Sequence, residues 1–219
     1  MFKKLLISLI LILSTSSIAN AFHPLIVDQA YTNGQGGFLV DINSAYSTKY
    51  SRVELNPEFS LGVIDRLDVI LGFKSDLSLA LGMNLDLKLL LYKNDFFAVS
   101  IKPSVGSSSL LSMVLGGGAY YFNLFAIASM DMGAFTIHEN LGYDFMNNAI
   151  FLSSAGVYKA SETIDITLNL GTRKFLGGDL FAIGGLIFAL SDNVFFDLGV
   201  KYELAGNDIS GLLGLAFKF

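Results

Sequence analysis

The chain has 219 residues, a net charge of −5 and no cysteine. Without cysteine it has no disulfide framework, no thiolate nucleophile and no cysteine-based metal site. The acidic balance and the lack of a basic stripe argue against a nucleic-acid partner. Hydrophobic residues make up 53% of the chain, yet charged residues recur every few positions. This combination favours a membrane protein that crosses without helices.

The N-terminus has the three parts of a secretory signal peptide. Lys3 and Lys4 form a basic start, Leu5–Leu13 an apolar core, and Ala19–Ala21 a small-residue cleavage site. An uncleaved anchor helix is the alternative, but the apolar run is shorter than the roughly 20 residues that a span needs. We therefore expect residues 1–21 to be removed on export and residues 22–219 to form one domain beyond the inner membrane.

Alternation with a period of two residues runs through the rest of the chain. In residues 52–63 and 77–91, apolar residues occupy one face, while Gly, Ser, Asn and charged residues occupy the other. This pattern predicts β-strands, because a helix would mix the two sets. The predicted strands begin near Phe38, Arg52, Leu67, Leu77, Phe96, Ala119, Phe135, Ala149, Thr163, Leu180, Val194 and Ile209.

The strands of a soluble β-sandwich also alternate between apolar and polar residues. The composition of the two faces therefore has to distinguish a soluble sandwich from a membrane barrel. The polar face is rich in small residues and carries charges of both signs, which suits a narrow lumen. The apolar face is larger than one sandwich core could bury. We therefore predict an all-β fold, a transmembrane antiparallel up-and-down β-barrel of about twelve strands in the bacterial outer membrane. Two alternating sets of turns and loops place both chain ends on the periplasmic side.

The stretch around residues 106–122 leaves two alternatives open. It contains three consecutive serines and a glycine triplet and has no charge, so an additional hairpin there would give fourteen strands. A spanning helix over residues 103–130 is the other alternative, because that range also has no charged residue. The glycine triplet and the strand patterns on both sides argue against the helix.

The last predicted strand ends on an aromatic residue. Its alternating apolar face resembles the C-terminal signal of outer-membrane barrels, which the barrel assembly machinery reads. The resemblance implies that role for Leu213, Leu215, Phe217 and Phe219.

Several segments resemble one family of outer-membrane barrels. Ala21–Leu25, Asn33–Phe38 and Gly62–Gly72 carry the resemblance, and Leu141–Tyr143 fits the same pattern. The family is named for the meta-cleavage (MetA) pathway of phenol degradation, and its members are described as transporters. The resemblance covers the first third of the chain well and the rest mainly by architecture. It implies an outer-membrane barrel and bears little on the substrate.

The chain has two histidines, His23 and His138. On a strand, His138 shares a face with Asn140, and such a pair on a barrel resembles an outer-membrane phospholipase, but the serine expected beside it is absent. We expect no enzyme activity, no cofactor and no metal site. In the alternating pattern, Glu139 falls on the same face as Ile137 and Leu141, which points it toward lipid, where a charge is costly. We therefore expect a bulge at Glu139 or a position near the rim of the barrel.

Charged residues of both signs fall on the predicted inner face, and two interpretations stay open. They line a small aqueous path and bias it by charge, or they pair into a salt-bridge network that fills the barrel. The candidate pore-lining residues are Glu54, Glu58, Asp68, Asp86, Lys88, Lys102, Asp165, Arg173, Asp197, Lys201 and Glu203. A more apolar part of the inner wall is predicted at Ala182, Gly184, Leu186 and Phe188.

The sequence thus predicts a passive channel or transporter for small molecules, with hydrophobic ones among the candidates. The alternative is a structural or interaction barrel with a side-chain-filled lumen. The expected partners are outer-membrane lipid, the barrel assembly machinery and a small-molecule solute, with no nucleic acid.

Overall fold

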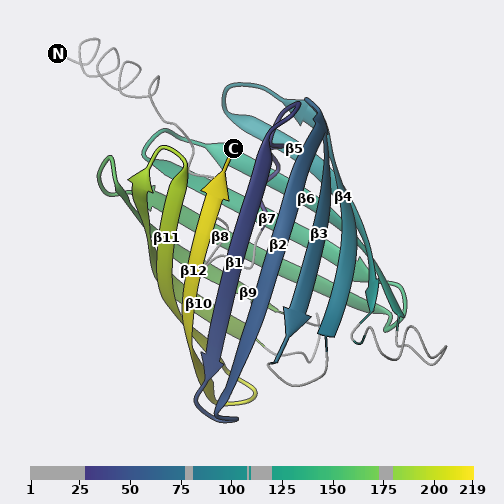
Figure 1. Cartoon of the computed structure of the whole chain (residues 1–219), viewed down its shortest axis with the longest axis vertical. Coiled ribbons are helices and arrows are strands. Elements are labelled where there is room, and N and C mark those ends of the chain that lie inside the picture. Colours follow the sequence, from purple (N-terminus) through teal and green to yellow (C-terminus); the bar gives the residue numbers. More distant parts are fainter. Residues whose placement is uncertain (1–27, 77–80, 108, 110–119, 173–179) are drawn as a thin grey trace.

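The computed structural model describes residues 28–76, 81–107, 109, 120–172 and 180–219, which form a closed antiparallel β-barrel (Figure 1). Consecutive strands pair with each other, and β1 closes the barrel against β12. The strands are β1 (Phe38–Ser47), β2 (Arg52–Ile64), β3 (Leu67–Ser75), β4 (Leu81–Lys93), β5 (Phe97–Ser107), β6 (Tyr120–Asp131), β7 (Phe135–Asp144), β8 (Ala149–Lys159), β9 (Ile164–Thr172), β10 (Leu180–Ser191), β11 (Val194–Glu203) and β12 (Asp208–Lys218).

Successive side chains alternate between the lumen and the outer surface of the barrel. Asp68 of β3 is paired with Lys88 of β4, and both are buried inside. Their neighbours Leu87 and Leu89 are exposed on the outside, as are large apolar side chains on every strand except β3. Because closure leaves no strand edge and the outer face is apolar, the barrel is suited to lipid.

The two ends of the barrel differ in the length of their connections. Where β1 begins and β12 ends, the strands are joined by two to four residues, as at residues 65–66 and 192–193. At the other end, four to twelve residues separate the described strands. In outer-membrane barrels the short turns face the periplasm, so we name the first end the periplasmic end and the other the extracellular end.

The predicted strands are confirmed, with strand starts at the predicted residue or within one residue of it outside β4, where residues 77–80 are not described. Twelve strands close the barrel, so the fourteen-strand alternative is wrong. Pro103 lies in β5 and Met130 in β6, so the predicted helix alternative is also wrong. In the part of the chain that is described, no helix has the length and apolarity to cross a membrane. The predicted signal peptide, residues 1–21, lies outside the described residues.

The predicted orientation of β10 is wrong. Ile183 and Ile187 face the lumen, where they are buried and paired with Lys201 and Asp197 of β11. The side chains predicted to face inward therefore face outward: Ala182, Gly184, Leu186 and Phe188. Both faces of β10 are apolar, so its own sequence does not fix its orientation; its pairing with β11 does.

The predicted bulge or rim position at Glu139 is also wrong. Glu139 is paired with Ala128 of β6 and Ser154 of β8, and the register of β7 is continuous on both sides. It is the fifth residue of the ten-residue strand β7. A carboxylate therefore stands on the outer face of the barrel, well inside the strand.

Candidate functional site

The inner face of the barrel carries the predicted charged residues. Asp68 and Asp197 are fully buried, and Asp86, Lys88, Lys102 and Lys201 are nearly so. Glu58 is paired with Asp41, and Asp165 with Ile187, which places both on the same inner face. Glu54 and Glu203 face inward near the extracellular end. Arg173 lies outside the described residues.

Buried charge pairs concentrate on the inner wall formed by β2–β7. Lys88 Nζ lies 3.5 Å from the Asp68 carboxylate, and Lys102 Nζ lies 3.6 Å from the Asp86 carboxylate. The Lys102 ammonium also lies over the Phe125 ring, 5.2 Å from its centroid. Buried charges require such partners, because removing an ion from water without compensation is costly. This wall therefore contains part of the predicted salt-bridge network.

A second group of charges lies toward the extracellular end. Glu54 pairs with Arg52 and, at 3.2 Å, with Lys74. On β11, Lys201 pairs with Glu203. The Arg52 and Lys74 side chains are about half or more exposed, so their pairs are screened by water and add little to stability.

Residues Asp28–Gly37 precede β1; Asp28–Ala30 lie inside the barrel, and Gln35–Gly36 are exposed beside the β2–β3 turn. We name Asp28–Gly37 the lumenal segment. Ala30 is fully buried, and its N–H donates to Ser129 Oγ at 2.8 Å. The Ala30 carbonyl accepts from the Ser100 hydroxyl. Asp28 forms an ion pair with Lys102. With its amide oriented to match these partners, Asn140 of β7 bonds both the N–H and the carbonyl of Asp28.

Closer to the periplasmic end, Asn33 fixes the lumenal segment to β2 and β3. Its backbone N–H is shared between the two Asp68 carboxylate oxygens at 3.1 and 3.0 Å. Its side-chain amide donates to Ser60 Oγ at 2.7 Å. Asp68 thus pairs with Lys88 on the barrel wall and also binds the segment, which couples the two.

Gly62 of β2 is the closest point of contact with the lumenal segment. Its N–H donates to the Gly37 carbonyl and its carbonyl accepts from the Gly36 N–H, both at 2.8 Å. A Cβ atom on Gly62 would lie 1.8 Å from the Gly34 carbonyl oxygen. Only glycine therefore permits this approach of two backbones.

The structure corrects the prediction that no serine stands beside His138. Ser129, on the neighbouring strand β6, places its hydroxyl 2.8 Å from His138 Nδ1. Both side chains are buried, and Ser129 Oγ also accepts the Ala30 N–H. In this arrangement the pair binds the lumenal segment, and the serine has no open approach for a substrate.

The inner wall formed by β8–β12 and β1 is different in character. Phe181, Ile183 and Leu212 form one buried apolar cluster. Asn169 of β9 lies between Ala155 and Ile183 in the register and is fully buried. Among the described residues, neither polar atom of its amide has a hydrogen-bond partner, and the Thr167 hydroxyl has none either.

On this wall formed by β8–β12 and β1, a glycine leaves room for the Asp197 carboxylate. In the register, Gly214 of β12 lies between Asp197 of β11 and Asn43 of β1. A Cβ atom on Gly214 would lie 2.3 Å from Asp197 Oδ2 and 2.7 Å from Asn43 Oδ1. The two side chains therefore share the space above Gly214, and a carboxylate and an amide meet on the lumen wall.

A polar cavity of about 720 Å³ opens at the periplasmic end, between the lumenal segment and the turns. The Lys93 ammonium lies over the Tyr31 ring there, 5.3 Å from its centroid. The charged residues that line this cavity are Asp65, Arg66, Lys93, Asp95 and Asp131. The periplasmic end of the barrel is thus hollowed and hydrophilic beside the lumenal segment.

Sequence reasoning missed the lumenal segment and the residues that hold it. Asp28–Gly37 has no periodicity, and its contacts with Asp68 and Ser129 span 35 and 99 residues of sequence. One available signal was Asn33-Gly34-Gln35-Gly36-Gly37, since glycine at this density permits close backbone contacts and positive φ angles. Gly34 and Gly36 do have φ values of 77° and 78°.

Comparisons with known proteins support the architecture. No family model matches the chain, and no curated protein matches it. Among solved structures, the KdgM porin in complex with disordered oligogalacturonate superposes with a TM-score of 0.70, at 12% identity over 83% of this chain and 99% of the porin. The NanC porin gives 0.62, at 11% identity over 82% and 100% of the two chains. The outer membrane protein Omp33 of Acinetobacter baumannii gives 0.60, at 10% identity over 84% and 100%.

The fold therefore defines the class: a twelve-stranded barrel of the outer-membrane porin type. Together with the apolar outer face, this fold indicates an outer-membrane location. The structural neighbours named above are barrels called porins or outer membrane proteins, and none is named as an enzyme. The phenol-degradation family predicted from the sequence is not confirmed by these comparisons.

Proposed function

We propose that this barrel is an outer-membrane channel for small solutes, narrowed on one side by the lumenal segment. The observation that carries the proposal is the architecture: a closed twelve-stranded barrel with charged and polar side chains on its inner face, and a polar cavity of about 720 Å³ at its periplasmic end. Solved structures that superpose on this barrel are named porins.

The charge of the inner face favours cations and neutral solutes over anions. Among the described candidate pore-lining residues, the acids are Glu54, Glu58, Asp68, Asp86, Asp165, Asp197 and Glu203, and the bases are Lys88, Lys102 and Lys201. Asp28 and Asp41 add to the acids, and Lys74 and Lys159 to the bases. An acidic lining raises the local concentration of cations. The KdgM porin was solved with oligogalacturonate, a polyanion that this lining disfavours.

The apolar inner wall supports a solute with a hydrophobic part. Phe181, Ile183 and Leu212 line one region, and Leu39, Ile187 and Phe195 another nearer the periplasmic end. Asp197 stands between them, since it pairs with Ile187 in the register. This side of the lumen therefore offers apolar contacts beside a carboxylate, which suits a small molecule with an apolar body and a polar or cationic group.

A barrel closed by its own residues is the second candidate, and the lumenal segment favours it. The segment fills space against β2–β7 and is held by the Asp28–Lys102 ion pair and the Asn33–Asp68 hydrogen bonds. In that case the paired charges stabilise a structural or interaction barrel. The two candidates differ in one measurable property, conductance.

Planar-bilayer recording in a potassium chloride gradient tests the proposal. We expect unit conductance steps and a reversal potential that shows potassium passing about twofold or more faster than chloride. Asp197→Asn should reduce this preference, whereas Asp192→Asn, a matched change in the β10–β11 turn, should not. The absence of unit steps would overturn the channel and favour the closed barrel.

We also propose that the barrel assembly machinery reads the last strand. Leu213 and Phe219 are exposed on the outer face, and the Phe219 ring packs 6.1 Å from that of Phe38. In cells, Phe219→Ala should slow the appearance of folded barrel in the outer membrane severalfold. Refolding of the purified variant into detergent should stay within about twofold of wild type; equal slowing in both assays would assign Phe219 to packing alone.

A further inference from the structure

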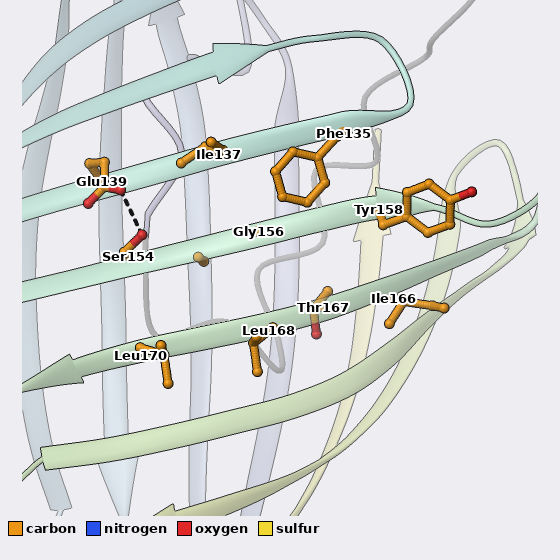
Figure 2. A pocket seen from close by; sticks show the side chains of 11 residues that line it. Phe135, Ile137, Glu139, Ser154, Gly156, Tyr158, Ile166, Thr167, Leu168 and Leu170 are labelled. Atoms are coloured by element: carbon orange, nitrogen blue, oxygen red, sulfur yellow. Dashed lines mark hydrogen bonds between the residues drawn. The ribbon is translucent and has the colours of Figure 1, made fainter.

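The outer wall of the barrel is hollowed on the side away from the lumen (Figure 2). A groove of about 340 Å³ runs across β7, β8 and β9. Gly156 supplies no side chain at its floor, and a Cβ atom there would lie 2.8 Å from the Phe135 ring. The apolar side chains that line the groove are Phe135, Ile137, Tyr158, Ile166, Leu168 and Leu170.

One end of this groove is polar. Glu139 and Ser154 point toward each other from adjacent strands, and the Ser154 hydroxyl donates to Glu139 Oε1 at 2.6 Å (Figure 2). On the described outer faces of β7, β8 and β9 no lysine or arginine is present to neutralise the carboxylate. A carboxylate has several acceptor positions, so a single serine leaves hydrogen-bonding capacity directed into the groove.

The depth of Glu139 excludes an ordinary surface position. It lies four residues beyond Phe135, the first residue of β7, which is about 14 Å along a strand and roughly 10 Å along the membrane normal at the usual tilt. The apolar band of such barrels is about 25 Å tall. Glu139 therefore faces hydrocarbon, where a carboxylate is stabilised by a donor or cation that enters with it.

We propose that this groove binds a small membrane-dissolved amine, with its nitrogen on Glu139 and its apolar body along Gly156. The ammonium of such an amine donates hydrogen bonds to the Glu139 carboxylate, beside the Ser154 hydroxyl. The volume matches the small end of ligand pockets. Headgroup amines of phospholipids lie at the interface and do not reach this depth, so the ligand is a free amphipathic amine.

This site is independent of the lumen, so it stands whether or not the barrel conducts. The chain contains no tryptophan, which makes a single-reporter experiment possible. Phe135→Trp places a reporter on the groove, and Phe196→Trp places a matched one on the outer face of β11. Both variants are reconstituted in phosphatidylcholine vesicles and titrated with dodecylamine carrying a nitroxide, or with the same nitroxide chain lacking the amine.

We expect the labelled amine to quench the Phe135→Trp reporter at an about tenfold lower mole fraction than the Phe196→Trp reporter. The chain without an amine should quench both alike. Adding Glu139→Gln should abolish the difference, and Ser154→Leu, which fills the groove while keeping the outer face apolar, should do the same. A shift in gel mobility on heating reports whether each variant is folded.

Equal quenching of the two reporters, or an unchanged difference in the Glu139→Gln variant, would overturn the proposal. Competition by phosphatidylethanolamine added to the vesicles would assign the groove to a lipid headgroup and overturn the free amine as its ligand. Failure of the channel recordings leaves these measurements unaffected, because the reporters lie on the lipid side.

Discussion

The two inner walls of the barrel differ in how many buried charges they carry and in how these charges are paired. On β2–β7, Lys88 and Lys102 each face a carboxylate, and the lumenal segment supplies Asp28 as a further one. On the wall of β8–β12 and β1, apolar residues dominate, and Asn169 has no hydrogen-bond partner in the described part of the chain. The first wall pairs its buried lysines with carboxylates, whereas the second is mainly apolar.

This difference indicates which side of the lumen the lumenal segment occupies. The wall that binds the lumenal segment is occupied along Asp28–Gly37, so it serves to hold the segment in place. Under the proposed function, solute passes along the second wall, beside Asn169 and Asp197. The predictions below each change one wall and leave the other intact.

The largest effect is expected from displacing the lumenal segment with Gly62→Val. Its Cβ would stand 1.8 Å from the Gly34 carbonyl oxygen, and two backbone hydrogen bonds at Gly36 and Gly37 would be lost. We expect conductance to rise about twofold or more, because a narrower lumen has a higher resistance, and limited proteolysis to cleave the segment in folded barrels.

Gly211→Val is the matched control, because a Cβ atom on Gly211 meets nothing within 4 Å. It should leave both conductance and protease resistance unchanged. If Gly62→Val also leaves conductance and protease resistance unchanged, Gly62 does not hold the lumenal segment, and the segment does not bind to the wall of β2–β7.

The same comparison explains what the sequence can predict. The strands and their register follow from alternation, because each inner polar residue such as Asp197 or Asn169 fixes the orientation of its strand. β10 lacks such a residue on either face, so its orientation depends on pairing with β11. Ser129 and His138 were not linked in advance because they meet only across the β6–β7 ladder.

The lumenal segment was beyond prediction for a different reason. Its residues have no alternation, and each of its contacts is with a residue on a distant strand, as Asn33 is with Asp68. Such contacts exist only after the barrel has closed. Alternation describes strands well, but it says nothing about a segment that runs inside them.

An intermediate effect is expected from Lys102→Met, which removes the cation shared by Asp28 and Asp86. The free energy of unfolding should fall by about 3–5 kcal/mol, because breaking a buried pair leaves unpaired buried carboxylates. Urea titration followed by heat-dependent gel mobility measures this value.

Lys74→Met is the control. The Lys74 side chain is 65% exposed and paired with Glu54, so the substitution should lower the free energy of unfolding by at most about 1 kcal/mol. Equal losses for both would mean that the first wall is open to water.

The smallest effect on stability, and the sharpest test of the second wall, is expected from Asn169→Leu. Both amide atoms lack a partner among the residues that the structure describes, so the change should leave the free energy of unfolding unchanged or raise it by about 1 kcal/mol. Asn33→Leu, which loses the bond to Ser60, should instead lower it by about 1 kcal/mol. Because the change removes a polar group from the proposed path, Asn169→Leu should also reduce conductance. A variant that loses stability without losing conductance would place a protein partner on Asn169 and move the path elsewhere.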